Sequence, residues 1–273
     1  MTLDAASAAS LSLEAARSGA STASLVLVGP GPAAGARLVL VVDGGGGEHS
    51  HGTLPTPELD AAGLQAARNA LGNPRHRDGI VALGVDTEAY LEVRRPVPDL
   101  IIVGAGHIAL PMAGTGADLG YRVWVLDDRP DFATRERFPS AHRVVRADFS
   151  DPFRDVPIHR GTHILLVTRG HKYDYECLLK VLGHDPAPAY IGMIGSRRRV
   201  RATFAQLLED GIPRRRLLDI HAPVGLDIGA ETPEEIAVAV AAELVKARRG
   251  GTGASLRDVE NVAERFFPEG DEA

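Results

Sequence analysis

The segment that most constrains the fold is an apolar run followed at once by two closely spaced glycines. Leu100 to Val103 carries no charge, Gly104 and Gly106 come next, and Ala109 completes the pattern Gly-x-Gly-x-x-Ala. Such a run is typical of a buried strand, and glycines permit a tight turn that leads directly into a helix. The pattern predicts a strand, a turn that can accept a phosphate, and a helix that runs towards Leu119.

A pair of carboxylates follows this turn at a meaningful distance along the chain. Arg122 to Leu126 forms a second apolar run, and Asp127 and Asp128 come directly after it. In dinucleotide-binding βαβ units a carboxylate about 20 residues beyond the glycines accepts hydrogen bonds from ribose hydroxyls. We therefore interpret the glycines and Asp127 as part of a ligand site. A tight strand-to-helix turn without any ligand is the alternative interpretation.

Apolar runs continue to alternate with helical stretches, which favours a mostly parallel sheet with helices on both faces. These runs lie at 100–103, 122–126, 163–167 and 189–194. The sequence therefore predicts a Rossmann-like α/β domain over residues 97–250. Its last helix has a predicted capping box that begins at Thr232, and Gly250 should end it. If the first helix begins near Gly106, Pro111 should kink it by removing one backbone hydrogen bond.

The chain before this domain has a different pattern. A helix ending near Gly19, paired strands at 24–28 and 37–42, a helix at 59–71 and a strand pair at 79–93 predict a small α+β domain over residues 1–96. Pro96 and Pro98 mark its boundary. Residues 251–273 are predicted to form a helix, from Ser255 to Phe267, and an acidic tail.

Polar residues follow the two later strands of the α/β domain. Thr168, Arg169, Gly170 and His171 come after the strand at 163–167. Gly195 and Ser196 come after the strand at 189–194, and Ser196 can cap a helix whose first residues are Arg197, Arg198 and Arg199. Cations in a first turn oppose the helix dipole, and a bound anion would remove that conflict. A solvated basic helix face is the alternative.

The loop from His221 to Ala230 precedes the capped helix and should be fixed in place. Because ligands of open α/β sheets bind outside the carboxyl ends of the strands, we expect all of these loops to converge on one edge. The predicted cofactor-binding residues are Gly104, Gly106, His107, Asp127, Asp128, Arg129, Thr168, Arg169, Gly170, His171, Gly195, Ser196, Arg197, Arg198, His221, Gly225 and Asp227.

Composition excludes several classes of protein. A formal net charge of −6 gives no overall attraction to nucleic acid or anionic membranes. Cys177 is the only cysteine, which rules out an intrachain disulfide and suits a reducing cytoplasm. Neither a secretory signal nor a membrane span is expected. His49 and His51 are predicted to lie in an exposed glycine-rich loop, and no metal site is predicted because two histidines do not complete one.

Five segments resemble the C-terminal domain of XdhC/CoxI-type accessory proteins for molybdenum hydroxylases such as xanthine dehydrogenase. The resemblance covers about residues 100–250. It implies a maturation factor that binds molybdopterin-type cofactor, takes part in its sulfuration with a sulfurtransferase partner, and delivers it to the apo-enzyme. The segments are GAGHIA at 104–109, DDRPDFATRERFP at 127–139, TRGH at 168–171, AYIGMIGSRRR at 189–199 and HAPVGLDIGAETPEEIAVAVAAE at 221–243.

The sequence also departs from this family. Its amino-terminal domain usually carries Ser-Ser-Pro-Arg and Gly-Gly-Cys, whereas here only Gly35-Ala36-Arg37 and Gly52-Thr53-Leu54 remain recognisable, and no cysteine precedes Cys177. Tyr173 stands where relatives often have a second histidine. Any cofactor role of the family's missing cysteine is therefore not available to this chain.

The resemblance favours a cofactor-binding chaperone over a catalyst, and the question whether the protein is an enzyme stays open. The alternative is an NAD(P)-dependent oxidoreductase, or a nucleotide-binding regulator, that uses the same glycine turn. The sequence has no Tyr-x-x-x-Lys pattern for hydride chemistry. The expected partner is a molybdenum hydroxylase apo-enzyme, and a homodimer is left open.

Overall fold

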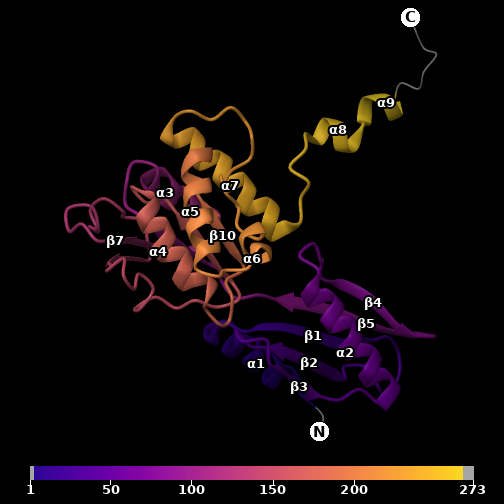
Figure 1. Ribbon diagram of the computed structural model, residues 1–273. Helices are drawn as coiled ribbons and strands as arrows, with labels where there is room; N and C mark the ends of the chain where they lie inside the picture. Colours follow the sequence, from indigo (N-terminus) through magenta and orange to yellow (C-terminus); the bar gives the residue numbers. More distant parts are fainter. Residues whose placement is uncertain (1–2, 267–273) are drawn as a thin grey trace, which may run out of the picture.

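The computed structural model of the chain describes residues 3–266 and contains two five-stranded sheets (Figure 1). The first sheet is antiparallel and belongs to the amino-terminal part of the chain, and the second is parallel. Each sheet has its own hydrophobic core. An extended connection between Arg94 and Asp99 joins them, so the domain boundary predicted at residues 96 and 97 lies in this connection.

The antiparallel sheet has the strand order β3-β2-β1-β5-β4. The helix at 57–72 packs on the core of this sheet. The helix at 5–18 ends where the sequence predicts, at Gly19, which has a left-handed backbone with φ 80°. The elements are α1 (Ala5–Ser18), β1 (Ser21–Val28), β2 (Arg37–Val42), β3 (Glu48–Gly52), α2 (Pro57–Gly72), β4 (Gly79–Gly84) and β5 (Thr87–Arg94). The predicted α+β character is confirmed, but His49 and His51 lie on edge strand β3 and not in a loop.

The parallel sheet has the order β10-β9-β6-β7-β8. The chain builds outward from β6 to β8 and then returns to the other side of β6 with β9, so the topological switch point lies between β6 and β9. The strands are β6 (Asp99–Val103), β7 (Arg122–Asp127), β8 (Arg143–Arg146), β9 (Thr162–Leu166) and β10 (Tyr190–Met193). Strand β8 was not predicted, because its four residues begin and end with arginine.

Helices cover both faces of this sheet, as predicted. Ile101 of β6 belongs to the core beneath α4 and α5, whereas the next residue, Ile102, belongs to the core beneath α3 and α7. This alternation follows from the two-residue period of a strand. The helices are α3 (Ala109–Asp118), α4 (His171–Leu182), α5 (Arg197–Glu209), α6 (Arg214–Leu218) and α7 (Pro233–Arg249). The capping box of α7 and its stop at Gly250 are confirmed.

The predicted kink at Pro111 is wrong. Helix α3 begins at Ala109 and not near Gly106, so Pro111 is its third residue. The backbone N–H groups of a first helical turn have no partner within the helix, and a proline there removes no hydrogen bond. The first backbone bond of the helix runs from Met112 to Ile108.

The segment 255–266 projects away from both domains (Figure 1). Two short helices, α8 (Leu256–Glu260) and α9 (Val262–Phe266), replace the single predicted helix, because Asn261 between them has a φ of 48°. Phe267 and the predicted acidic tail lie outside the described residues. Among residues 3–266, no helix has the length and apolar character that crossing a bilayer requires.

Candidate cofactor-binding site

The two glycines of the turn after β6 are required for different reasons. Gly104 has a φ of 108°, and a Cβ added to it would lie 2.4 Å from the carbonyl oxygen of Val167 at the end of β9. The close approach of the two chain segments at the switch point therefore requires glycine at position 104. A Cβ on Gly106 would meet no atom within 4 Å. The fold itself therefore does not need glycine at position 106. The absence of a side chain there leaves open space in which a ligand can approach the backbone.

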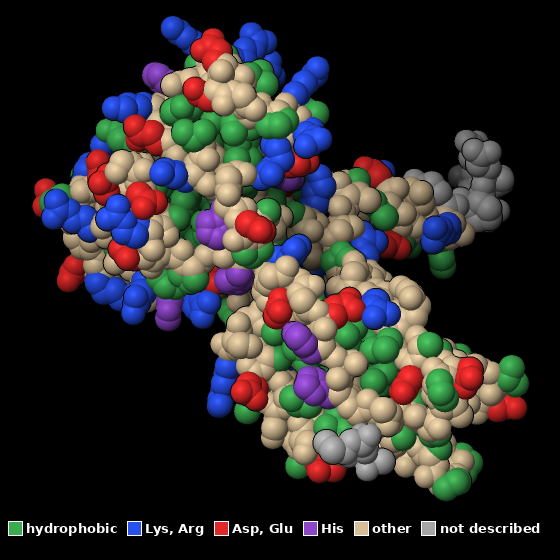
Figure 2. All heavy atoms as spheres, turned by 60° about the horizontal axis from the view of Figure 1, so that its bottom comes forward, with side chains coloured by type: hydrophobic (Ala, Val, Ile, Leu, Met, Phe, Trp, Pro, Cys, Tyr) green, Lys and Arg blue, Asp and Glu red, His purple; other side chains and the backbone are tan. Residues whose placement is uncertain are grey.

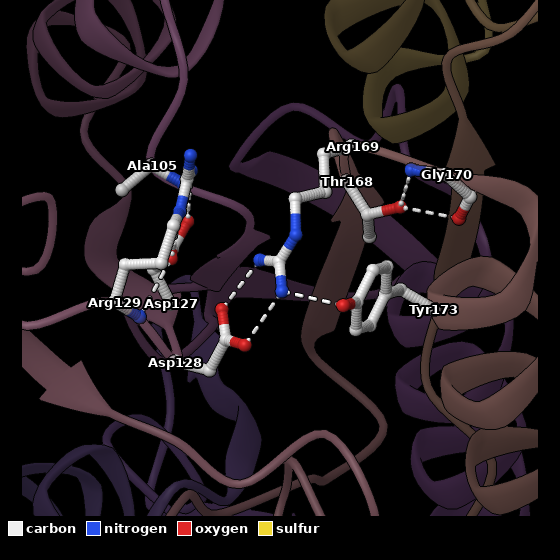
Figure 3. A network of polar contacts seen from close by, with 8 residues as sticks. All are labelled: Ala105, Asp127, Asp128, Arg129, Thr168, Arg169, Gly170 and Tyr173. Carbon is white, nitrogen blue, oxygen red and sulfur yellow. Dashed lines mark hydrogen bonds and ion pairs between the residues drawn. The ribbon is translucent and has the colours of Figure 1, made fainter.

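Asp127 holds the glycine turn in place. Its side chain is 1% exposed, and its two oxygens accept four hydrogen bonds: from the backbone N–H of Ala105 at 2.7 Å, and from the backbone and guanidinium of Arg129 at 2.9–3.0 Å (Figure 3). Burial raises the pKa of Asp127, but the bonds from Arg129 and Ala105 outweigh it and lower the pKa to about 2. The predicted ribose contact stays a prediction, and it would require Arg129 to yield one of these positions.

Asp128 and Arg169 connect the loops on either side of the glycine turn. The Arg169 guanidinium donates to both Asp128 oxygens, at 2.5 and 2.7 Å, and to the Tyr173 hydroxyl at 2.5 Å (Figure 3). It also lies 4.0 Å from the centroid of the Tyr173 ring. Both charged side chains remain about one-third exposed, at 36% for Arg169 and 32% for Asp128. An ion pair this accessible to water is weak and can open for a ligand.

A buried cluster fixes the next loop. Asp174 is fully buried and accepts hydrogen bonds from Arg199 Nε at 2.5 Å and from the Thr168 hydroxyl at 2.7 Å. Arg199 Nη2 also donates to the carbonyl and hydroxyl oxygens of Thr168. Sequence reasoning missed Asp174, and it named Arg199 at the start of this helix without including it in the predicted site. Their pairing explains one of the three first-turn arginines without an anion, because Arg199 neutralises a buried carboxylate.

The start of α5 keeps two arginines without partners. Ser196 caps the helix, as predicted, since its hydroxyl accepts the N–H of Arg199. Arg197 and Arg198 are exposed, and neither makes a hydrogen bond or an ion pair within the part of the chain that the structure describes. The electrostatic conflict with the helix dipole therefore persists at these two residues, and they remain available to an anion.

The loop after His221 is held by Glu243 of α7. The His221 imidazole hydrogen-bonds one Glu243 oxygen, and the other accepts the N–H of Gly225 at 2.5 Å. The backbone of His221 pairs with Ile191 and Met193, which places this segment beside β10. Its ring stacks on Tyr190 at 4.3 Å. The prediction of a fixed loop is confirmed, but Glu243, the buried carboxylate of α7 that holds it, was not among the predicted residues.

The structure brings most of the predicted residues to one sheet edge. The contacts Ala105–Asp127, Asp128–Arg169 and Thr168–Arg199 link the loops after β6, β7, β9 and β10 in series. The side chains of His107, His171 and Asp227 are exposed and make no hydrogen bond or ion pair to any described residue. No group of three His, Cys, Asp or Glu side chains within residues 3–266 could hold a metal.

Comparisons with known proteins agree with this architecture. A crystal structure described as a xanthine dehydrogenase from Bacillus halodurans covers 89% of this chain and 64% of its own, with a TM-score of 0.58 and 23% identity, which shows a shared fold. The uncharacterized protein YqeB of Escherichia coli is 32% identical over 182 residues, or 65% of this chain and 33% of that protein. A probable xanthine dehydrogenase component of Bacillus subtilis is 34% identical over 166 residues, or 60% of this chain and 47% of that protein.

The chain thus spans less than half the length of either curated relative in these matches. The family model described as the XdhC Rossmann domain matches residues 100–244, more than half of the chain. That range contains the glycine turn, the Asp128–Arg169 pair and the start of α5. The resemblance drawn from the sequence is confirmed, and the chain belongs to the XdhC family.

Proposed function

We propose that this protein binds molybdopterin, or a nucleotide form of it, at the glycine turn and assists the maturation of a xanthine-dehydrogenase-type molybdenum hydroxylase. Membership of the XdhC family supports the link to such enzymes. The name of the Bacillus subtilis relative, which describes a probable component of xanthine dehydrogenase, supports it too. The proposal concerns cofactor binding and delivery, with the hydroxylase apo-enzyme as partner.

The observation that carries the proposal is the pair of unpartnered arginines at the start of α5. Arg197 and Arg198 share one sheet edge with the open space beside Gly106. Molybdopterin bears a phosphate, and an arginine fork together with the first N–H groups of a helix suits a phosphate. The donor set therefore fits the phosphate end of this cofactor. When bound, molybdopterin supplies the sulfur ligands that hold molybdenum in the mature enzyme.

The remaining residues of this edge would position the rest of the ligand. Asp127 keeps the glycine turn closed against β9, so the backbone at Gly106 is presented rigidly. Opening of the Asp128–Arg169 pair would free a carboxylate for N–H and O–H groups and a guanidinium for a second anionic group. Without a ligand, Asp128 and Arg169 thus neutralise each other's charge, and a ligand that binds both groups can take the place of this weak pairing.

An NAD(P)-dependent oxidoreductase is the second candidate, because the glycine turn and the following carboxylates match a dinucleotide-binding unit. Against it, all four hydrogen bonds that Asp127 accepts come from Ala105 and Arg129. A ribose diol would have to compete with a guanidinium and a backbone amide in a buried place. The pterin proposal does not require that exchange.

Calorimetric titration of the purified protein with molybdopterin, its nucleotide forms, NAD and NADP tests the proposal. A pterin should bind more tightly than either dinucleotide. Gly106→Ala should weaken pterin binding more than tenfold while changing the unfolding free energy by less than about 0.5 kcal/mol, because its Cβ enters open space.

Gly114→Ala is the matched control. It also adds a Cβ that meets no atom within 4 Å, but within helix α3, where alanine is favoured over glycine. It should leave binding unchanged and stabilise slightly. Tighter binding of NAD than of any pterin would transfer support to the oxidoreductase, and normal binding by Gly106→Ala would show that the turn is not the site.

A further inference from the structure

A cavity lies on the edge of the parallel sheet opposite the glycine turn, where the two domains meet. Its volume is about 570 Å³, within the range of small-molecule sites. The amino-terminal domain contributes Val42, Asp43 and Pro74, and the Rossmann domain contributes residues that precede its strands, such as Pro98 and Gly161. The glycine turn and α5 contribute nothing to this cavity. We call it the interdomain cleft.

Four arginines line the interdomain cleft: Arg95, Arg160, Arg248 and Arg249. Figure 2 shows basic side chains where the two lobes of the molecule meet. The guanidinium groups of Arg160 and Arg249 make no hydrogen bond or ion pair within the described part of the chain. Arg248 donates Nη2 to the Leu119 carbonyl at 3.2 Å, but its buried Nε has no partner there.

None of these guanidinium groups forms an ion pair with a carboxylate in the part of the chain that the structure describes. Arg95 donates to the carbonyls at the end of α2, and burial together with the charge of Arg249 lowers the pKa of Arg95. Asp43 is the one acidic residue among those that line the cleft, and it accepts the N–H groups of Gly45 and Gly47 at 2.8 Å. Like charges gathered without counter-charges destabilise the folded state, and a bound anion would relieve this.

The walls of the cleft suit a ring as well as an anion. Pro74, Pro96 and Val97 supply apolar surface, and His163 supplies a ring that is 5% exposed. That ring is fixed between Tyr121, at 5.1 Å, and Tyr190, at 5.9 Å. The Arg248 guanidinium lies 4.7 Å over the Tyr121 ring, so it is already oriented before any ligand arrives.

We propose that the interdomain cleft binds a nucleoside monophosphate, with its phosphate held by Arg160, Arg248 and Arg249. Arginine forks suit a phosphate, and the volume leaves room for a ring beside it. Such a ligand would contact both domains at once. Its binding would therefore fix the domains relative to each other, and this site is independent of the glycine turn.

Titration of the full-length protein with AMP, GMP and inorganic phosphate tests the assignment. At least one of the two nucleotides should bind more tightly than phosphate. The double variant R160Q/R249Q should weaken nucleotide binding more than tenfold, because two charge-assisted contacts are lost. Both arginines are exposed and unpaired, so the variant should fold, and its free energy of unfolding should equal that of the parent protein or be slightly higher, because two crowded like charges are removed.

Two controls separate this site from the proposed pterin site and from general electrostatics. R214Q/R215Q removes the same charge from α6, outside the cleft lining, and should leave nucleotide binding unchanged. Gly106→Ala should also leave it unchanged, while R160Q/R249Q should leave pterin binding unchanged. The assignment is overturned if neither nucleotide binds, if R160Q/R249Q binds normally, if the α6 variant loses as much affinity, or if phosphate binds as tightly as nucleotides.

Discussion

The two edges of the parallel sheet differ in whether their arginines are paired with carboxylates. At the carboxyl edge three arginines are each paired with a carboxylate, whereas the arginines of the interdomain cleft at the amino edge have no such partner among the residues that the structure describes. The pairs at the carboxyl edge are Arg129–Asp127, Arg169–Asp128 and Arg199–Asp174. A count of arginines therefore does not locate an anion site. The informative quantity is the number of arginines that lack a carboxylate.

Asp127, at the end of β7, and Asp99, at the start of β6, are both buried, but Asp99 binds residues from more parts of the sheet. Asp127 accepts hydrogen bonds only from residues of the adjoining turns. Asp99, at the start of β6, binds Arg122 and Trp124 of β7 and also His159, which precedes β9. Burial raises the pKa of Asp99, but these hydrogen bonds outweigh it and hold the pKa far below its usual range. Asp99 thus ties three parts of the amino edge together.

The largest expected effect follows from this difference. Asp99→Ala should lower the free energy of unfolding by about 3 kcal/mol, because it leaves the buried indole N–H of Trp124 and the partly buried imidazole of His159 without their acceptor and breaks the ion pair with Arg122. Asp127→Ala should cost less, because its only side-chain donor is Arg129, which is one-third exposed and can turn to water, and no buried indole loses its acceptor. Urea unfolding of both variants measures the difference. An equal or larger loss for Asp127→Ala would contradict the comparison.

A second prediction concerns pH and the amino edge. Burial of His163, assisted by the charge of Arg248, lowers its pKa to about 4. Below about pH 6.5 the His163 imidazole therefore binds a proton in the unfolded chain, whereas in the folded chain it binds that proton only below about pH 4. The stability linked to His163 is fully present above pH 6.5 and is lost as the pH falls towards 4, by about 2–3 kcal/mol.

Urea unfolding at pH 7.5, 6.0 and 5.0 tests this sign and size. His163→Phe, which retains a ring between Tyr121 and Tyr190, should lose less stability on acidification than the parent protein. His49→Gln changes a side chain that is 67% exposed and should keep the parental pH dependence. Parallel pH profiles for the parent and His163→Phe would mean that the buried imidazole does not resist protonation.

Local sequence patterns predicted the elements whose residues carry their own signal. The apolar run at 100–103, the glycine turn and the capping box at Thr232 each encode structure within a few neighbouring residues, and each was confirmed. Strands β3 and β8 escaped prediction because neither contains an apolar run, whereas the other two edge strands, β4 and β10, do. An edge strand pairs on one side only and can therefore tolerate charged or polar residues.

The site needed information that no local pattern contains. Arg199 and Asp174 are 25 residues apart, and whether they meet depends on how α4 and α5 pack together. The interdomain cleft depends on still more distant parts of the chain, because Arg95 precedes and Arg249 follows the matched range 100–244. The sequence could supply the residues at the end of each strand. Which of their charges are already compensated became visible only in three dimensions.

The smallest effect on stability is expected at the Asp128–Arg169 pair, which most directly tests the comparison between the two sheet edges. Asp128→Asn removes the partner of Arg169 and should lower the unfolding free energy by less than about 1 kcal/mol, because both side chains reach water. It leaves an uncompensated arginine at the carboxyl edge, which then resembles the interdomain cleft. Affinity for pyrophosphate, measured by calorimetry, should therefore rise severalfold, and Arg169→Gln should lower it.

Asp151→Asn is the matched control for this prediction. It breaks the exposed Asp151–Arg154 pair and makes the same change in net charge away from the glycine turn. It should leave pyrophosphate affinity unchanged, because any gain must come from the freed Arg169 and not from the overall charge. If Asp128→Asn instead lowers the affinity tenfold, then Asp128 supports anion binding by positioning Arg169. In that case pairing at the carboxyl edge prepares the arginine for a ligand rather than compensating its charge.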